Sequence, residues 1–303
     1  MITLKKIRDL DVAPCPGAEM THLSAASGLL RAGSFLYVVA DDELHLGIFR
    51  TTGRAPGELV RLFDGALPAL KAERKREKPD LEALTLLPPS ADFPDGAMLA
   101  LGSGSTRNRQ RGVVLGLDAQ GALRGEPRIV DLTSVFSCMS ALRELNIEGA
   151  VVCGDEIRLF QRGSKGDSPN LIVRFSLPAF LAALNGATNS TIEPLAIQSI
   201  DLGGIDGVPY TFTDATALPN GEVVFTAVAE DTADSYNDGP CGGAIIGILD
   251  CENRVKRLLH LGVPLKIEGV DARVEGDIIG LMLVIDADDP SIPAGLFAAT
   301  MAR

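Results

Sequence analysis

The sequence contains no Trp and three His among its 303 residues. Without Trp it cannot carry the Trp-Asp signature of the best-known propeller repeat. His22, His45 and His260 are the available imidazole bases, and no GxSxG motif is present, so a Ser-His-Asp triad finds little support. The five Cys residues are odd in number and form no CxxC pair, which argues against a disulfide framework and against a zinc knuckle.

Positive charge and long apolar runs are also scarce. Lys and Arg number 28 against 40 Asp and Glu, and the formal net charge of −12 argues against a nucleic-acid partner, because phosphate backbones are held by cations. No run reaches the roughly 18 apolar residues of a membrane span, and Met1 to Asp11 lacks the apolar core of a signal peptide. We therefore expect a cytoplasmic protein with no membrane partner.

Turn residues and short apolar runs are what the sequence has in abundance. Hydrophobic residues make up 46% of the chain, and 32 Gly and 18 Pro divide them into short segments. Such punctuation indicates many strands and tight turns rather than a few long helices. The length would allow two domains of about 150 residues, but all-β folds of this size are often one domain. Helical pieces are expected in two connections, 66–78 and 178–184.

Five similar units follow one another along the chain. Each begins a short apolar strand, passes a turn dipeptide such as Asn220-Gly221, and continues into a second and a third apolar run. A fourth run follows in all but the last unit, and 1–10 can supply that missing strand. We therefore predict a single domain over residues 1–303, an all-β five-bladed β-propeller whose ring is closed by the N-terminal strand. A β-sandwich with similar hairpins is the alternative. The unit starts are marked by Ser24, Glu82, Glu148, Asp214 and Glu268.

An acidic residue stands at the start of the innermost strand in four of these units. In a propeller these strand starts converge on one mouth of the central channel, so Glu82, Glu148, Asp214 and Glu268 should lie near one another, with Ser24 in the fifth place. Like charges at short range raise one another's pKa unless cations compensate them. Oxygen ligands alone would suit Ca²⁺ or Mg²⁺. The structural alternative is that each acid accepts backbone hydrogen bonds and locks neighbouring blades together.

The second and third units add basic loops that should open on the same face. The segment 71–80 is rich in Lys and includes Lys78, and the following loop 102–112 combines glycines with hydroxyl and guanidinium groups. Such a collection suits a phosphate or carboxylate ligand, although it does not match a Walker P-loop. A solvated charged surface is the plain alternative. The candidate ligand-binding residues are Lys78, Ser103, Ser105, Arg107, Arg109 and Arg162.

Two further loops of the same face are acidic. They span 229–243 in the fourth unit and 286–295 in the fifth. Either loop could cover the channel mouth or bind a cation.

Several short motifs resemble those of uncharacterised bacterial propeller families and, more distantly, of the family labelled esterase-like activity of phytase. They are Lys78-Pro79-Asp80-Leu81-Glu82-Ala83-Leu84, Gly102-Ser103-Gly104-Ser105, Asn146-Ile147-Glu148-Gly149 with Arg162-Gly163, and Ile267-Glu268-Gly269. The resemblance implies a propeller and an esterase-like activity. Similar Glu-Gly strand starts occur in lactonase-type propellers that bind a divalent metal, but the chain has no clear match to their Asn and Asp ligands.

Two functions fit these observations. The first is a metal-dependent hydrolase of a small anionic ester or phosphoester, with a divalent cation on the acidic ring and the substrate on the basic loops. No catalytic residue is assigned from the sequence. The second is a noncatalytic propeller that binds a ligand or a protein on the same face.

Overall fold

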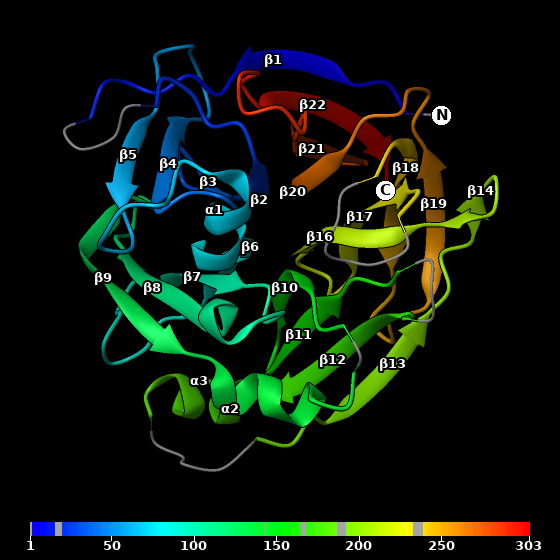
Figure 1. Ribbon diagram of the computed structural model, residues 1–303. Helices are drawn as coiled ribbons and strands as arrows, with labels where there is room; N and C mark the ends of the chain where they lie inside the picture. The colour runs from blue at the N-terminus through cyan, green and yellow to red at the C-terminus, as the bar shows by residue number, and fades with distance from the viewer. Residues whose placement is uncertain (1, 16–19, 143, 165–167, 187–191, 233–238) are drawn as a thin grey trace.

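Five antiparallel sheets of four strands stand side by side in a ring, and each sheet is built from one repeat of the sequence (Figure 1). The computed structural model describes residues 2–15, 20–142, 144–164, 168–186, 192–232 and 239–303. Part of the acidic loop 229–243, residues 233–238, lies outside this description. The predicted five-bladed β-propeller is confirmed.

The strands of each blade follow one another from the channel outward. Blade one comprises β2 (Ala26–Ala32), β3 (Phe35–Ala40), β4 (His45–Arg50) and β5 (Glu58–Arg61). Blade two comprises β6 (Leu81–Leu87), β7 (Ala97–Gly102), β8 (Arg111–Leu117) and β9 (Leu123–Asp131). Blade three comprises β10 (Ile147–Cys153), β11 (Glu156–Gln161), β12 (Asn170–Ser176) and β13 (Ala196–Ile200). Blade four comprises β16 (Thr211–Ala217), β17 (Val223–Glu230), β18 (Cys241–Leu249) and β19 (Val255–His260).

Blade five joins the two ends of the chain. It comprises β20 (Ile267–Glu275), β21 (Ile278–Ile285), β22 (Gly295–Ala302) and β1 (Lys5–Asp9), in the spatial order β20-β21-β22-β1. β1 pairs antiparallel with β22, with Lys5 opposite Ala298 and Asp9 opposite Gly295. The N-terminal strand thus supplies the outer edge of the last blade, as the repeat predicted.

Hydrophobic side chains fill the interfaces between blades. The described residues form five clusters of buried hydrophobic residues, and each cluster joins two blades that are neighbours in the ring. The inner strands also touch around the channel, since β2 contacts β6 and β20, and β16 contacts β10 and β20. Radial packing therefore buries both faces of every sheet.

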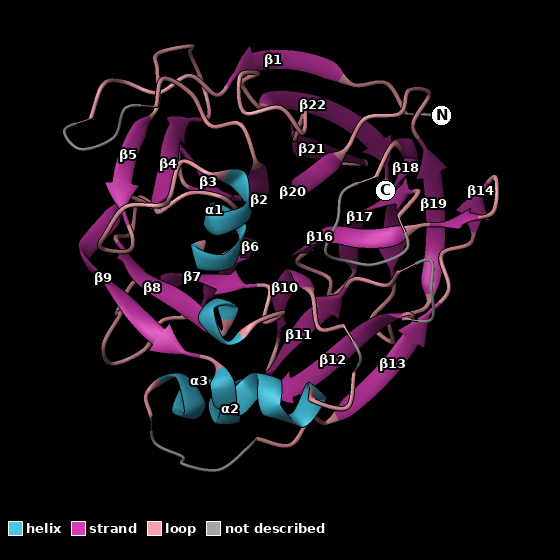
Figure 2. Cartoon of the chain, viewed as in Figure 1, coloured by secondary structure: helices cyan, strands magenta, loops and turns pink. Residues whose placement is uncertain are grey.

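Short helices lie in the connections (Figure 2). They are α1 (Lys71–Glu77), α2 (Thr133–Phe136), α3 (Leu177–Leu184) and the 3₁₀ turns η1 (Arg107–Arg109) and η2 (Ser137–Met139). α1 is shorter than the expected 66–78. It begins only after Leu70, which is extended with ψ of 122°, and it ends at Glu77, because Pro79 favours the extended conformation of Lys78 with ψ of 144°. A two-stranded hairpin, β14 (Gly204–Ile205) and β15 (Val208–Pro209), precedes blade four.

Every inner strand carries a β-bulge near its start. The pairing register with the second strand shifts by one residue there, which turns one side chain out of the regular alternation. The bulged residues are Ser27, Glu82, Glu148, Thr213 and Glu268.

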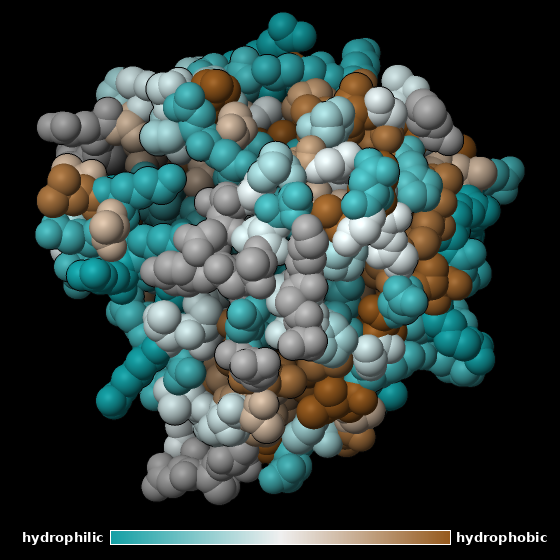
Figure 3. All heavy atoms as spheres, turned by 45° about the vertical axis from the view of Figure 1, so that its right-hand side comes forward, coloured by the Kyte–Doolittle hydropathy of each residue, from teal (hydrophilic) through white to brown (hydrophobic). Residues whose placement is uncertain are grey.

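The face in Figure 3 carries mostly hydrophilic side chains, with hydrophobic ones gathered on its right-hand side and at its lower centre. Exposed apolar residues include Leu195 and Ile197 at the outer strand of blade three. Within the part of the chain described, no helix has the length and apolar character needed to cross a membrane.

Candidate functional site

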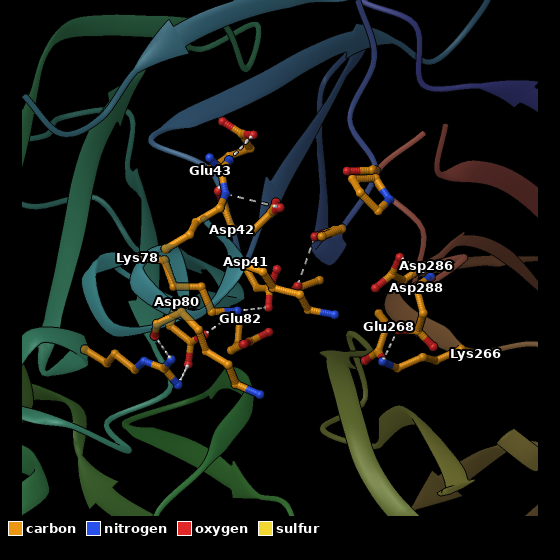
Figure 4. Close-up of a pocket in the computed structure, with 18 of the residues that line it drawn as sticks. Asp41, Asp42, Glu43, Lys78, Asp80, Glu82, Lys266, Glu268, Asp286 and Asp288 are labelled. Atoms are coloured by element: carbon orange, nitrogen blue, oxygen red, sulfur yellow. Dashed lines mark hydrogen bonds and ion pairs between the residues drawn. The ribbon is translucent and has the colours of Figure 1, made fainter. Parts of the chain in front are cut away.

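A cavity of about 780 Å³ opens at the channel mouth, a size typical of small-molecule pockets. Its walls come from blades one, two, three and five, and α1 contributes Lys71, Arg74 and Lys75. Carboxylates outnumber cationic groups among the lining residues. In Figure 4, Asp41, Asp80 and Glu82 lie on one side of the pocket, and Lys266 and Glu268 lie on the other.

Three of the five bulged residues are the glutamates that line this cavity. Glu82, Glu148 and Glu268 are each less than one-tenth exposed. The residue after the bulge is small in these strands, because the inner strand of the next blade approaches closely. A Cβ on Gly149 would come within 3.0 Å of the backbone nitrogen of Ala215. The bulge and the small residue together bring a buried carboxylate to the channel in three blades.

Blades one and two bring a first group of carboxylates together. Asp41 follows β3, Asp80 precedes β6, and Glu82 lies in β6; one carboxylate oxygen from each lies within 4.8 Å of the others. The Lys78 ammonium contacts Asp41 and lies 2.8 Å from Oδ1 of Asp80. Burial raises the pKa of Asp41 to about 6, against the opposing effect of Lys78.

Glu82 is the exception within this group. The residue is 8% exposed, and its carboxylate forms no hydrogen bond or ion pair with any residue that the structure describes. Burial, and next the charge of Asp80, raise the pKa of Glu82 well above its ordinary value. The group therefore contains one buried carboxylate without a counter-charge in direct contact.

Asp80 is held rigidly. Its backbone adopts φ of 57°, a left-handed conformation that non-glycine residues rarely occupy and that Asp tolerates better than most. Ser103 Oγ donates to Oδ2 of Asp80 at 2.5 Å, and Nη1 of Arg109 donates to the same oxygen at 2.7 Å. Both donors come from the Gly-Ser-Arg loop of blade two. That loop therefore positions Asp80, and Oδ1 is the oxygen left facing Lys78.

Ion pairs within blade three and between blades three, four and five lie along the inner wall. Nη1 of Arg162 lies 3.3 Å from Oε1 of Glu148, and Nη2 donates to Glu230 of blade four. Asn146 Nδ2 donates to the same oxygen of Glu148 at 2.6 Å, and Lys266 Nζ lies 3.2 Å from Oε1 of Glu230. Burial raises the pKa of Glu148 to about 7, although Arg162 opposes the rise. Arg162 is thus engaged with protein carboxylates.

Blade five supplies the second group of carboxylates. Oε1 of Glu268 is buried, accepts no hydrogen bond from the described residues, and lies 3.5 Å from Lys266 Nζ. Lys266 is closer to Asp288, at 2.7 Å from Oδ1. Burial raises the pKa of Glu268 well above its ordinary value and that of Asp286 to about 7. Two protonatable carboxyls therefore face the cavity opposite Glu82.

Asp214 does not line the cavity. It follows the bulged residue Thr213, and its carboxylate accepts hydrogen bonds from the backbone N–H groups of Ala215 (2.7 Å) and Val270 (2.8 Å). Because Val270 lies in β20, Asp214 links blades four and five. It has the blade-locking geometry that was the alternative for the whole acidic set. Ser24 lines the cavity, but the bulge of blade one is at Ser27.

Only some of the predicted ligand-binding residues line the cavity. Lys78, Ser105, Arg109 and Arg162 line the cavity, whereas Ser103 and Arg107 do not. Ser103 is fully buried behind Asp80, and Arg107 is exposed. Among those that line it, Lys78, Arg109 and Arg162 all contact protein carboxylates.

Sequence reasoning missed several lining residues. Asp41 follows the second strand of blade one, and Lys266 precedes β20. Asp286 also lines the cavity, but it belongs to the acidic loop 286–295 that was expected at the channel mouth. The rule that strand starts and second-to-third loops share one face applies to all of them. It could have found Asp41 in the short segment Asp41-Asp42-Glu43, which carries three consecutive acids.

Comparison with known proteins gives the family and the fold. The model of a family described as "Family of unknown function (DUF6929)" matches residues 22–301. No match was found among curated proteins. Among solved structures, glutaminyl cyclase from Myxococcus xanthus is 10% identical with a TM-score of 0.50, over 100% of this chain and 98% of that one. A luciferin-regenerating enzyme is 11% identical with a TM-score of 0.49, over 100% and 96% of the two chains. At these identities the likeness concerns the fold alone.

Proposed function

The chain belongs to the family of unknown function DUF6929, and because that description names no activity, we propose a function from the cavity itself: hydrolysis of a small anionic ester, a phosphoester among the candidates, with the help of a divalent cation. The observation that carries the proposal is the pair of facing carboxylate groups. On one side Glu82 provides a buried carboxylate without a counter-charge in direct contact, beside Asp41 and Asp80, and on the other side Glu268 provides a second buried carboxyl. The distant resemblance to the esterase-like activity of phytase family points the same way and stays a prediction.

Glu268 is the residue best suited to move a proton. General acid and base catalysis works best when the pKa of the group lies near the working pH, and burial moves the pKa of Glu268 upward from its ordinary value. Its Oε1 accepts no hydrogen bond within the described chain. In the proposed reaction Glu268 takes the proton of the attacking water; the ester bond breaks, and the departing alcohol receives the proton.

Lys71 is the residue best placed for the charge of the substrate. It is exposed, it belongs to α1, and it lines the cavity, whereas Arg109 and Arg162 are already bound to protein carboxylates. A divalent cation would supply Lewis-acid polarisation of the ester oxygen. The combination of acidic walls with a cationic rim favours a small substrate whose anionic end stays near the opening.

The first prediction tests this proposal with a panel of carboxylic esters, phosphomonoesters and phosphodiesters assayed in Ca²⁺ or Mg²⁺. Glu268→Gln is expected to lower kcat by about 100-fold or more on any substrate that turns over, since it removes the proton-transferring group. The control is Glu275→Gln, an exposed glutamate at the far end of the same strand, which should leave kcat unchanged. Turnover that survives Glu268→Gln, or no turnover across the panel, would contradict the proposal and leave a ligand-binding propeller.

A further inference from the structure

We propose that Asp41, Asp80 and Glu82 form a site for one hard divalent cation, Ca²⁺ or Mg²⁺, between blades one and two. Of the strand-start acids, only Glu82 is a ligand in this site. The other two ligands are Asp41, which follows β3, and Asp80, which precedes β6. It deepens the proposed function and rests on it for its catalytic meaning, but the binding can be measured without substrate.

The spacing of the oxygens is compatible with a shared ion. Ca²⁺ binds oxygen at about 2.3–2.6 Å, so two oxygens on opposite sides of one ion are separated by roughly 4.6–5.2 Å. One oxygen from each of Asp41, Asp80 and Glu82 lies within 4.8 Å of the others. For Mg²⁺, with distances of about 2.0–2.1 Å, two opposite oxygens are separated by roughly 4.0–4.2 Å. Carboxylates without nitrogen or sulfur ligands select such hard cations.

Glu82 gives an independent reason to place an ion there. It is 8% exposed and lines the cavity, and its carboxylate has no hydrogen-bond or ion-pair partner in the described part of the chain. Figure 4 shows it beside Asp80 and below Asp41, facing the pocket. A buried carboxylate left without a partner is destabilising, and a cation shared with two further carboxylates would remove that penalty.

Hydrogen bonds from the blade-two loop hold Asp80 in place as a ligand. Ser103 and Arg109 occupy Oδ2 of Asp80 and leave Oδ1 toward the group. The buried Ser103 and the left-handed backbone of Asp80 fix this orientation before any ion binds. The loop that the sequence suggested for substrate binding therefore supports a ligand of the cation instead.

Lys78 is the occupant that the cation would displace. Its ammonium contacts Asp41 and Asp80 but forms no ion pair with Glu82. A lysine holds its charge on a flexible stem, so it can swing toward the mouth of the cavity, where it also lines the wall. A divalent ion and the Lys78 ammonium compete for the same two carboxylates. Once displaced, Lys78 would offer its charge to the anionic end of a substrate.

The second prediction is a binding measurement on the full chain. After EDTA treatment and dialysis, isothermal titration with CaCl₂ and with MgCl₂ should give one site per chain for at least one of the two ions. Glu82→Gln keeps the shape of the side chain and removes one ligand charge, so affinity should fall at least tenfold. Lys78→Met removes the competing ammonium and should raise affinity several-fold. Glu43→Gln, which removes an acid that is paired with Arg74 outside the three-carboxylate group, should change affinity less than threefold.

The outcomes test the cation site and the hydrolase activity separately. Equal affinity of the original chain and Glu82→Gln, or no binding of either ion by the original chain, would overturn the cation site. Thermal melting of Glu82→Gln checks that it folds, and Asp41→Asn provides a second ligand variant if it does not. Binding that depends on Glu82 without any ester turnover would uphold the site and reject the hydrolase. No binding of either ion, together with ester turnover that EDTA does not affect, would reject the site and leave a hydrolase that needs no cation.

Discussion

Asp214 and Glu148 occupy equivalent places in the sequence repeat, but they differ in their position relative to the β-bulge of their strands. Glu148 is the bulged residue and faces the cavity, whereas Asp214 comes one residue after the bulge and accepts two backbone N–H groups. Hydrogen bonds from backbone N–H groups to a carboxylate contribute about 1.5–3 kcal/mol each. The side chain of Asp214 is therefore part of the joint between blades four and five.

The third prediction follows from this joint. Asp214→Asn keeps one acceptor oxygen but turns an NH₂ group toward a backbone donor, so we expect the free energy of unfolding to fall by about 2 kcal/mol in urea titrations. Asp201→Asn is the control, because that exposed side chain accepts one backbone N–H in a turn that Asn also supports. Cation affinity should not change in Asp214→Asn. A loss of cation binding without a loss of stability would place Asp214 in the site.

Single residues also show where sequence reasoning stops. The motif Ile-Glu-Gly marks the bulge correctly at Glu148 and Glu268, but the similar Thr213-Asp214-Ala215 is displaced by one position. A slip of one residue in a strand moves a side chain to the other face, and only the hydrogen-bond register reveals it. The repeat alone could therefore identify three of the five channel positions.

At the scale of the element, the hairpins were predictable and the outer strands were less so. The turn Asn220-Gly221, with φ of 82° at the glycine, joins β16 to β17 as its sequence indicates. The fourth apolar run of the third unit spans 192–200 in the sequence, and it predicts a strand from Ile192. The strand begins at Ala196 instead, because Ile192 packs into the cluster between blades two and three. Tight turns carry a local signal in the sequence. The ends of outer strands depend on packing partners far along the chain.

The fourth prediction concerns β1, the element that closes the ring. A chain that starts at Leu10 lacks the partner of β22, whose residues 295–298 pair with β1. Four lost residue pairings should lower the free energy of unfolding by about 2–4 kcal/mol. Hydrogen exchange should show faster exchange at alternate amides of β22, while the β20–β21 hairpin keeps its protection. Unchanged exchange in β22 would mean that β1 contributes no closure.

At the scale of the whole molecule, the site is made by convergence rather than by a motif. Asp41, Glu82 and Glu268 come from blades one, two and five, and they line one cavity. Because they are far apart in the sequence, no local motif predicts that they line the same cavity. The sequence could predict which face would carry the chemistry. It could not predict that Arg109 and Arg162 would be bound to protein carboxylates, because those pairings depend on the three-dimensional packing of loops.

The convergence of acids also sets the pH dependence of stability. Burial raises the pKa of Glu148 and of Asp286 to about 7, and it raises the pKa values of Glu82 and Glu268 well above their ordinary value. Unfolded carboxyls titrate near 4, so the folded chain binds more protons between about pH 4.5 and 7. The stability contributed by these protonated groups is present at low pH and is lost as the pH rises through the folded pKa values.

The fifth prediction is therefore that the metal-free chain becomes less stable as the pH rises from 5.5 to 8, by roughly 2 kcal/mol or more in urea titrations. This window avoids the opposite contribution of ion-paired acids such as Glu156, whose pKa is lowered chiefly by its hydrogen bond from Arg174. Ca²⁺ should restore stability at pH 8 in the original chain and not in Glu82→Gln. Stability that instead rises toward pH 8 without any cation would mean that Lys78, Arg162 and Lys266 already balance the cavity. In that case the buried charge of Glu82 would give no reason for an ion to bind.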